Sequence, residues 1–378
     1  MFAHRSSAYW RALAAACAVL VLLTGAAASQ GAAGGASIQV KRGAILAYIH
    51  DVQAQRKTLI GVQVNEYEVY IDCTSQDRLF TQTGKRTAVL GLELMNAIAV
   101  PPYAAYLTDR ALSQTAAGGL ITMSWHERNP VEVCQRGEYY ECAKKPMTAE
   151  TLRAVLTKGT PEHKLWLADV DALAKVLGNL HQRGVVVLLR PYHEMNGGWF
   201  WWGKQNAFPE LWDALFDELA VRHKLDNLIW VWSIDRDAPD AKPYYPLRHK
   251  PDVVGTDMYE LDPGTPKFAT ARANLVAAAG GSATFAITEV GLAPTAKVLD
   301  EVNPTWVLLW GDNIDADWAW NNNCPGCNKP DQISALFKLD RIVTLDKLPA
   351  GLRATIAAGV VNKHPLHRKS PSCPAKLR

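Results

Sequence analysis

The sequence has no excess of charge of one sign. Its 378 residues include 40 Lys and Arg against 37 Asp and Glu, a formal net charge of +3. Nucleic-acid-binding domains carry clustered basic charge, and this balance gives no electrostatic reason to expect such a partner. Apolar residues make up 48% of the chain and charged residues 20%, which is a globular composition and excludes wholesale disorder. We therefore expect a globular protein that binds no nucleic acid.

The apolar run near the N-terminus is short for a membrane span. It extends from Ala12 to Leu23, follows a basic start and precedes the alanines at 26–28. These are the three parts of a secretory signal peptide with an A-x-A cleavage site. We predict a signal peptide over residues 1–28 and a secreted protein, extracellular or periplasmic, with no stable membrane anchor after cleavage. The alternative is an envelope protein anchored by an uncleaved leader.

The cysteine spacing lacks the second half of a zinc site. One C-x-x-C occurs, at Cys324 and Cys327, without a second copy or an H-x₃₋₅-H partner. We therefore predict disulfides and no metal. Removal of the leader with Cys17 leaves six cysteines, an even number typical of an oxidising compartment. Sequence proximity favours two local pairs and leaves a third: Cys134–Cys142, Cys324–Cys327 and Cys73–Cys373.

Short apolar runs alternate with longer amphipathic stretches from residue 58 to 311. Most runs are apolar at consecutive positions, as in parallel strands buried on both faces. No glycine-rich phosphate-binding turn follows the first run, which argues against an open doubly wound sheet. We predict an α/β fold of the (β/α)₈ TIM barrel type. The predicted strands are Leu59–Gln63, Ala88–Leu92, Leu120–Ser124, Val185–Arg190, Leu228–Trp232, Val253–Asp257, Thr284–Glu289 and Trp306–Trp310.

The stretches between the strands show helical periodicity. One helix is predicted to end before Gly184, and another to begin at Pro209. A third amphipathic stretch, Lys41–Gln55, is expected to cap or flank the barrel. We predict one barrel domain over residues 29–362 and a solvated basic tail over 363–378. The stripe that predicts the first helix consists of Trp166, Val170, Leu173, Leu177 and Leu180.

The segment from Arg190 to Gly203, RPYHEMNGGWFWWG, begins where the fourth predicted strand ends. Active sites of (β/α)₈ barrels lie at this end of the strands. The segment carries Glu194 directly after His193, and four aromatic residues follow. Indole rings stack on the apolar faces of pyranose rings, so the pattern indicates sugar binding. The alternative is a packing cluster with an incidental glutamate, but a Gly-Gly turn places these aromatic residues in a loop.

Hydrolysis of a glycosidic bond needs a second carboxyl group, and the seventh predicted strand ends in one. Glu289 closes this apolar strand, precedes Val290-Gly291 and has no obvious packing role. Barrel closure would bring it to the same mouth as Glu194, and retaining enzymes hold their carboxyls about 5–5.5 Å apart. Glu93 and Asp257 also lie at strand ends, where a structural ion pair is the commoner role of an acid.

Further side chains are predicted at the same face. Tyr259 follows the sixth strand and is placed to donate a hydrogen bond to the second carboxylate. Trp310 closes the eighth strand and is expected to form the floor of the sugar site. His126 follows Trp125 at the end of the third strand, and we expect it, with His193, to contact sugar hydroxyls or tune a carboxyl. An ordinary packed histidine is the alternative for each.

The fourth-strand segment resembles the acid/base signature of glycoside hydrolase family 26, best known for endo-β-1,4-mannanases. Four other segments are similar and follow the family's order: Ser124–His126, Asn227–Ser233 (NLIWVWS), Val253–Tyr259 (VVGTDMY) and Ile287–Gly291 (ITEVG). The resemblance covers residues 41 to 325. It implies a glycoside hydrolase catalytic domain that retains anomeric configuration, with Glu194 as general acid/base, Glu289 as nucleophile and no cofactor.

The resemblance also implies a substrate. The WFWWG ending favours β-1,4-linked mannan and glucomannan over the substrates of the family's lichenases and β-1,3-xylanases, and we expect a monomer. A carbohydrate-binding barrel without activity would lack one of the two carboxylates, and both are present. The Cys134–Cys142 loop and the Cys324–Cys327 turn depart from the family core and leave the preferred chain length open. The expected substrate-binding positions are His193, Trp199, Tyr259, Trp310, Trp125, His126, Arg190, Asn196 and Trp202.

Overall fold

The computed structural model describes residues 36–70, 73–237, 239–314 and 324–362. The predicted signal peptide (1–28) and basic tail (363–378) therefore lie outside the described residues. Within the described ranges, no helix combines the length and the apolar character needed to cross a membrane.

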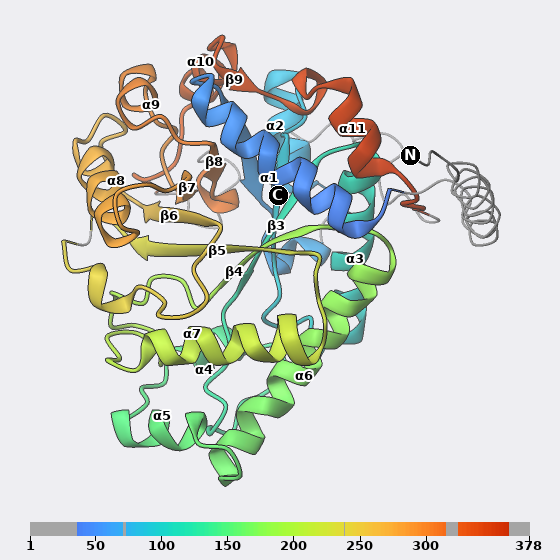
Figure 1. The fold of residues 1–378 in the computed structure, drawn as a ribbon. Coiled ribbons are helices and arrows are strands. Elements are labelled where there is room, and N and C mark those ends of the chain that lie inside the picture. The colour runs from blue at the N-terminus through green and yellow to red at the C-terminus, as the bar shows by residue number, and fades with distance from the viewer. Residues whose placement is uncertain (1–35, 71–72, 238, 315–323, 363–378) are drawn as a thin grey trace, which may run out of the picture. The chain divides into compact units, whose positions relative to one another are not determined.

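Eight parallel strands close into a barrel, which confirms the predicted (β/α)₈ fold (Figure 1). β1 pairs with both β2 and β8, and every other strand of the ring pairs with its neighbours in chain order. All eight predicted strands are present. They are β1 (Thr58–Gln63), β2 (Val89–Glu93), β3 (Leu120–Trp125), β4 (Val187–Pro191), β5 (Leu228–Asp235), β6 (Val253–Met258), β7 (Phe285–Val290) and β8 (Trp306–Leu309).

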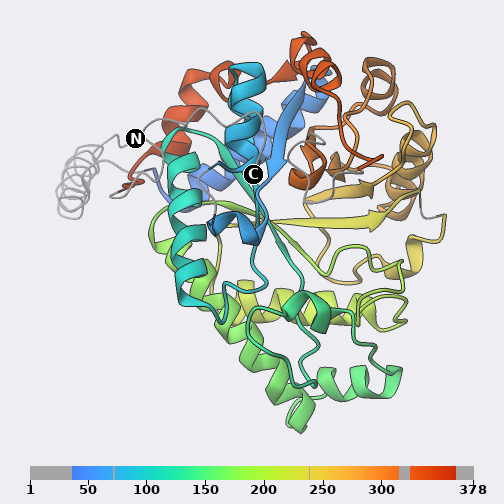
Figure 2. The same cartoon turned by 180° about the vertical axis from the view of Figure 1, so that it is seen from behind.

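Helices surround the barrel on the outside (Figures 1 and 2). They are α1 (Ile38–Ala54), α2 (Ser75–Thr83), α3 (Pro101–Ala116), α4 (Tyr139–Ala143), α5 (Ala149–Leu156), α6 (Pro161–Gln182), α7 (Phe208–Phe216), α8 (Lys267–Ala278), α9 (Ala296–Val302), α10 (Pro330–Lys338) and α11 (Ala350–Ala357). Single turns of 3₁₀ helix are η1 (Glu66–Tyr70), η3 (Lys242–Tyr244), η4 (Gly311–Asn313) and η5 (Leu345–Lys347), and η2 (Asp217–Arg222) is π-helical.

α6 shows how the sequence determines a helix. Thr160 accepts a hydrogen bond from the backbone N–H of His163 at the start, and Pro161 occupies the first turn, where its missing N–H costs nothing. The predicted apolar stripe is buried against the barrel. The chain leaves the helix at Gly184, which has φ +75° and tolerates the left-handed conformation. The capping groups therefore determine where α6 begins and ends, and the apolar stripe determines which face of the helix packs against the barrel.

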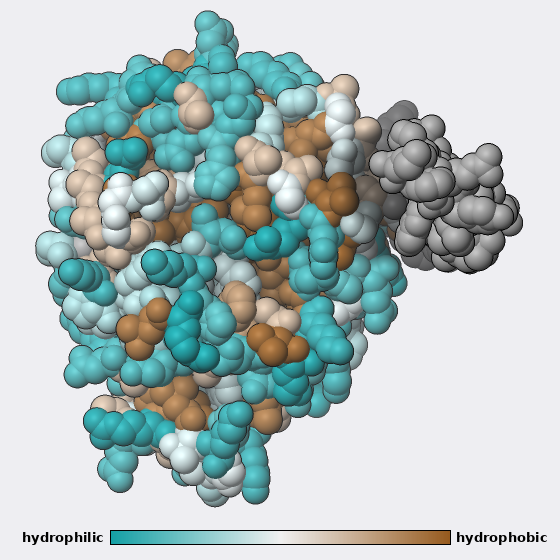
Figure 3. Space-filling model, viewed as in Figure 1, coloured by the Kyte–Doolittle hydropathy of each residue, from teal (hydrophilic) through white to brown (hydrophobic). Residues whose placement is uncertain are grey.

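The strands are apolar at consecutive positions because they pack on two cores. One face contacts the surrounding helices, and the other fills the barrel. Helix α1 completes the inner core, since Ile45, Ile49 and Val52 pack with strand residues at the end of the barrel where the strands begin. The predicted amphipathic stretch thus caps that end. The space-filling view shows a mainly hydrophilic surface with separate apolar patches (Figure 3).

Two short elements outside the ring add to the structure. The two-residue strand β9 (Ile342–Val343) pairs with β1, an extension that the sequence did not predict. Both predicted local disulfides form, Cys134–Cys142 in the loop after β3 and Cys324–Cys327 after β8. Cys73 is also disulfide-bonded, but its predicted partner Cys373 lies outside the described residues.

Candidate active site

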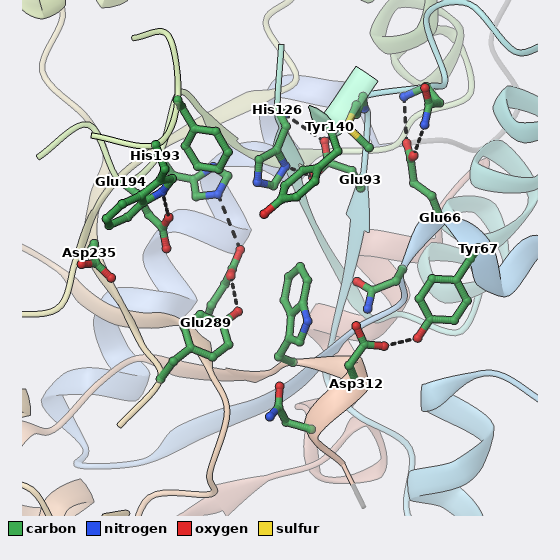
Figure 4. A pocket seen from close by; sticks show the side chains of 18 of the residues that line it. Glu66, Tyr67, Glu93, His126, Tyr140, His193, Glu194, Asp235, Glu289 and Asp312 are labelled. Carbon is green, nitrogen blue, oxygen red and sulfur yellow. Dashed lines mark hydrogen bonds and ion pairs between the residues drawn. The ribbon is translucent and has the colours of Figure 1, made fainter. Parts of the chain in front are cut away.

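A cavity of about 880 Å³ lies where the strands end (Figure 4). Because parallel strands of a barrel all finish at one face, each of the eight delivers a side chain to this cavity from one of its last two residues or from the segment just beyond. In strand order these side chains belong to Asn65, Glu93, His126, Glu194, Asp235, Tyr259, Glu289 and Trp310. Acidic and aromatic groups dominate the set.

Glu194 is held in an unusual backbone conformation. Its φ is +56°, and that of Tyr192 is +50°, a region that residues with side chains seldom adopt. The turn is fixed because the Glu194 N–H donates to the Ser233 carbonyl at 2.9 Å and its own carbonyl accepts from Gly197 at 2.8 Å. The tight turn directs the carboxyl into the cavity, where the side chain points toward that of Glu289 (Figure 4). Such strain is typical of functional sites.

The surroundings of Glu194 favour its protonated form. Burial raises the pKa of this carboxyl well above its usual range, and the negative charges of Asp257, Glu289 and Asp235 raise it further. One group acts in the opposite direction: the Trp199 indole N–H donates to Oε2 at 2.7 Å. The net shift of the Glu194 pKa is upward and favours the protonated form, the state that a general acid needs.

Glu289 has a different environment, although it lies in the same cavity. One of its oxygens accepts a hydrogen bond from the guanidinium of Arg190. The other accepts from the hydroxyl of Tyr259 at 2.5 Å. Burial and the neighbouring Glu289 raise the pKa of Tyr259 well above its usual range, so the phenol remains a donor. Two donors on two oxygens fix the orientation of the carboxylate, as nucleophilic attack requires.

Arg190 connects the carboxylate of Glu289 to Asp257 on the neighbouring strand β6. Its Nη1 donates to Asp257 at 2.8 Å, and the other Asp257 oxygen accepts from Thr288 at 2.6 Å.

His193 Nε2 lies 3.9 Å from Glu289, and burial together with the charges of Arg190 and His126 lowers the pKa of His193 well below its usual range. His193 is therefore a neutral imidazole at the cavity wall.

His193, Asp257 and Glu289 place their ligand atoms within 4.8 Å of one another, a spacing compatible with a metal ion. The guanidinium of Arg190 contacts both carboxylates and supplies the positive charge that an ion would bring. The donor set therefore suits an internal ion-pair network.

Glu93, a competing strand-end acid, is in contact with the imidazole of His126. Nδ1 of His126 lies 2.8 Å from Glu93, which also accepts from Ser124 and from backbone N–H groups. Burial alone would raise the pKa of Glu93, but the charge of His126 and these hydrogen bonds outweigh it and lower the pKa. The Glu93 carboxylate therefore holds the imidazole of His126 at the cavity wall.

The structure brings seven of the predicted site residues to the cavity: Glu194, Glu289, His193, His126, Trp199, Tyr259 and Trp310. Trp199 is 41% exposed at the cavity edge, as expected of a loop aromatic that faces a groove. The other four predicted substrate-binding residues do not line the cavity.

Trp125 and Trp202 are both fully buried. Successive residues of a strand point to opposite faces, so His126 faces the cavity while Trp125 points into the outer core and packs on Tyr192, with ring centres 5.5 Å apart. Trp202 donates from Nε1 to the His193 carbonyl at 2.8 Å and stacks on Phe200. The expectation that these rings bind substrate is corrected: they support the loop that carries Glu194.

Asn196 and Arg190 also act beneath the cavity. The Asn196 side chain exchanges two hydrogen bonds with the backbone of Asp235, at 2.9 and 2.8 Å, and so joins the β4 loop to the end of β5. Arg190 is buried on the two carboxylates described above. Both residues are positioning residues in this structure and leave no polar group in the cavity for substrate.

Sequence reasoning missed one end of the cavity, formed by Glu66, Tyr67, Asn96 and Asp312. Burial and Glu93 raise the pKa of Glu66 to about 8, although Asn96 donates two hydrogen bonds to it. Glu66 and Tyr67 follow β1, so the strand-end rule that found Glu194 could have found them. Tyr140 was also missed, because it lies on the short helix α4, well beyond the end of β3, where this rule does not apply.

Trp199→Phe is expected to move the alkaline limb of the kcat/KM profile to higher pH. The substitution removes the N–H that lowers the pKa of Glu194, so the acid stays protonated to higher pH. The measurement is kcat/KM against pH for wild type and variant. Trp310→Phe is the matched control, because this ring also lines the cavity but is not hydrogen-bonded to Glu194 in the described part of the chain. An unmoved limb in Trp199→Phe would contradict the assigned hydrogen bond.

A buried carboxyl group whose surroundings favour its protonated form and a second carboxylate held by two donors share one open cavity at the active face of a barrel. This is the arrangement of catalytic groups in glycoside hydrolases. The chain belongs to glycosyl hydrolase family 26, whose family model matches residues 36–346.

Comparisons with individual proteins agree. A mannan endo-1,4-beta-mannosidase of Thermothelomyces thermophilus is 29% identical over 296 residues, which are 73% of this chain and 57% of that protein. The solved structure of GH26A from Muricauda sp. MAR_2010_75 aligns with a TM-score of 0.70 and 28% identity, over 82% of this chain and 97% of that one. The GH26-CBM35 beta-(1,4)-mannanase of Podospora anserina aligns with a TM-score of 0.67 and 28% identity, over 82% and 67%. The chain thus spans little more than half of the curated relative.

Proposed function

We propose that the protein is a retaining glycoside hydrolase that cleaves β-1,4-mannosidic bonds in mannan and glucomannan. The observation that carries the proposal is the difference between the two carboxyl groups. Glu194 has surroundings that keep it protonated, whereas Glu289 is oriented by Arg190 and Tyr259. Two carboxyls with separate roles are what glycoside hydrolysis requires.

The proposed reaction has two displacement steps. In the first, Glu289 attacks the anomeric carbon while Glu194 gives its proton to the leaving oxygen, which yields a covalent glycosyl-enzyme. In the second, Glu194, now a carboxylate, removes a proton from water, and the water oxygen displaces Glu289. Two inversions restore the original anomeric configuration. Proton NMR during the first minutes of hydrolysis tests this, because a retaining enzyme releases the β-anomer first.

The substrate assignment depends on the relatives, which are named for mannan. Product analysis on mannan, glucomannan, lichenan and β-1,3-xylan tests it. Hydrolysis of the two mannose-containing polymers with little action on the others is expected. Preferential action on lichenan or on β-1,3-xylan would contradict the proposal and indicate a lichenase or a β-1,3-xylanase of the same family. Binding without hydrolysis of any polymer would indicate a carbohydrate-binding barrel.

We further propose that the protein is exported and that its leader is removed near Ser29. The two disulfides of the described chain suit an oxidising compartment. Intact-mass spectrometry of the exported protein without reductant is the test. Retention of Met1, or free thiols at the bonded cysteines, would contradict export.

A further inference from the structure

The loop between β3 and α5 is a firmly held wall of the cavity. It contains the short helix α4 and is closed by the Cys134–Cys142 disulfide. The Asn129 side chain donates to the Lys145 carbonyl at 3.0 Å, and the Ala143 carbonyl accepts from the Trp201 N–H at 2.9 Å. The loop is therefore fixed to itself and to the segment that follows Glu194.

Tyr140 projects from this wall into the cavity, where Figure 4 shows it between His193 and Glu93. Its ring meets His126 and Phe200 edge-on, with ring centres 5.4 and 6.1 Å apart, and the Lys144 ammonium lies 4.2 Å above it. The residue is nevertheless 41% exposed. Three contacts thus orient a ring whose remaining surface faces the space that a ligand would fill.

The hydroxyl of Tyr140 makes no hydrogen bond to any other residue in the described part of the chain, in contrast with the hydroxyl of Tyr259, which donates to Glu289. Burial and the charges of Glu194 and Glu289 raise the pKa of Tyr140 to about 12. The hydroxyl therefore keeps its proton throughout the working range of an enzyme. A free donor and acceptor held beside two catalytic carboxyls is suited to a sugar hydroxyl.

The position of Tyr140 also determines which part of the bound polysaccharide it would contact. The acid must lie beside the leaving oxygen, so the leaving part of the chain occupies the end of the cavity at Glu194 and Asp235. The part that becomes attached to Glu289 then extends the other way, toward Glu66. Tyr140 lies on this second side of Glu194 (Figure 4).

We infer that Tyr140 is a specificity-determining residue, whose hydroxyl hydrogen-bonds a hydroxyl group of the sugar that is transferred to Glu289. The disulfide-closed loop holds it in place. The inference rests on the proposed function and deepens it, since it assigns one wall of the glycone subsite to a loop that departs from the family core.

The test compares Tyr140→Phe with Tyr139→Phe. Both remove one phenol oxygen from α4, but Tyr139 is buried, contacts Arg128 and does not line the cavity. Tyr140→Phe should lower kcat/KM about three- to tenfold, mainly through KM, because it removes a neutral hydrogen bond made in both ground and transition states. Tyr139→Phe should change kcat/KM by less than about twofold.

Two substrates locate the contact. The loss in Tyr140→Phe should be equally large for mannopentaose and for a dinitrophenyl β-mannobioside, which has no sugar in its leaving group. A loss confined to mannopentaose would place Tyr140 on the leaving-group side and overturn the assignment. Equal kinetics for Tyr140→Phe and Tyr139→Phe would overturn it as well. If the wild-type protein hydrolysed none of the substrates, this result would instead contradict the proposed function itself.

A double-mutant cycle tests the role of the disulfide. Opening the loop with Cys134→Ser and Cys142→Ser should lower kcat/KM in the wild-type background and much less in the Tyr140→Phe background, because the two changes remove the same contact. Equal fold losses in both backgrounds would show that the disulfide does not act through Tyr140.

Discussion

Glu194→Ala is expected to lower kcat/KM on mannan by about 10²–10⁴-fold, the usual contribution of a positioned general acid. The loss should shrink greatly on a dinitrophenyl β-mannobioside, whose leaving group departs without a proton. The covalent intermediate should then accumulate, because the general base of the second step is also missing. Added azide, a nucleophile that needs no general base, should speed its turnover. Stopped-flow release of dinitrophenolate measures both effects.

Glu289→Ala should behave differently, because removal of the nucleophile prevents the first step whatever the leaving group. Activity on both substrates should disappear together, and no burst of dinitrophenolate should be seen. Glu150→Gln, which changes an exposed carboxylate on α5, is the control for general effects of charge removal. Equal losses for Glu194→Ala on the activated and natural substrates would show that the two roles are wrongly assigned.

Arg190→Met is expected to lower the free energy of unfolding by about 3–5 kcal/mol, the usual cost of leaving buried charge without its partner. The guanidinium contacts both Asp257 and Glu289, and all three side chains are almost completely buried. Hydrolysis should be lost as well, because nothing then orients the Glu289 oxygen that Arg190 held. Urea unfolding and kinetics on the same preparation measure the two effects.

Two further variants separate charge from geometry. Arg190→Lys keeps the charge but not the fork that reaches two carboxylates, so it should recover part of the stability and little of the activity. Adding Asp257→Asn to Arg190→Met removes one unpaired charge and should restore part of the stability alone. Full stability in Arg190→Met would mean that the buried network is not the ion-pair system described above.

The sequence was sufficient to predict the barrel because its strands are buried on both faces, so each appears as a continuous apolar run between amphipathic helices. The position of Glu194 and Glu289 at the cavity was predictable for the same reason, since Glu289 lies at the end of such a run and Glu194 lies three residues beyond another. The π-helical element η2 that follows α7 and the strand β9 were not predictable. Both are short and depend on tertiary contacts.

The sequence could not decide which of two neighbours faces the cavity. Trp125 and His126 are both strand-end residues of a type that binds sugars, and only the pleat of β3 places one inward and the other in the outer core. Strand-end acids posed the same problem. Glu93 is paired with His126. Asp257 shares Arg190 with Glu289, but its other oxygen accepts from Thr288, whereas that of Glu289 accepts from Tyr259. These partners belong to other strands, so the sequence around each acid does not reveal them.

The capping of the barrel by α1 has a consequence for how the protein tolerates additions. α1 and α11 lie side by side, and residues of both belong to the core at the end of the barrel remote from the cavity. Among the described residues, the first and last helices are thus neighbours at the end of the barrel remote from the cavity. A binding module or an affinity tag fused before α1 or after α11 would start from that side. A long polymer could then lie across the cavity without meeting the fused part, which makes this barrel a convenient component of multimodular proteins.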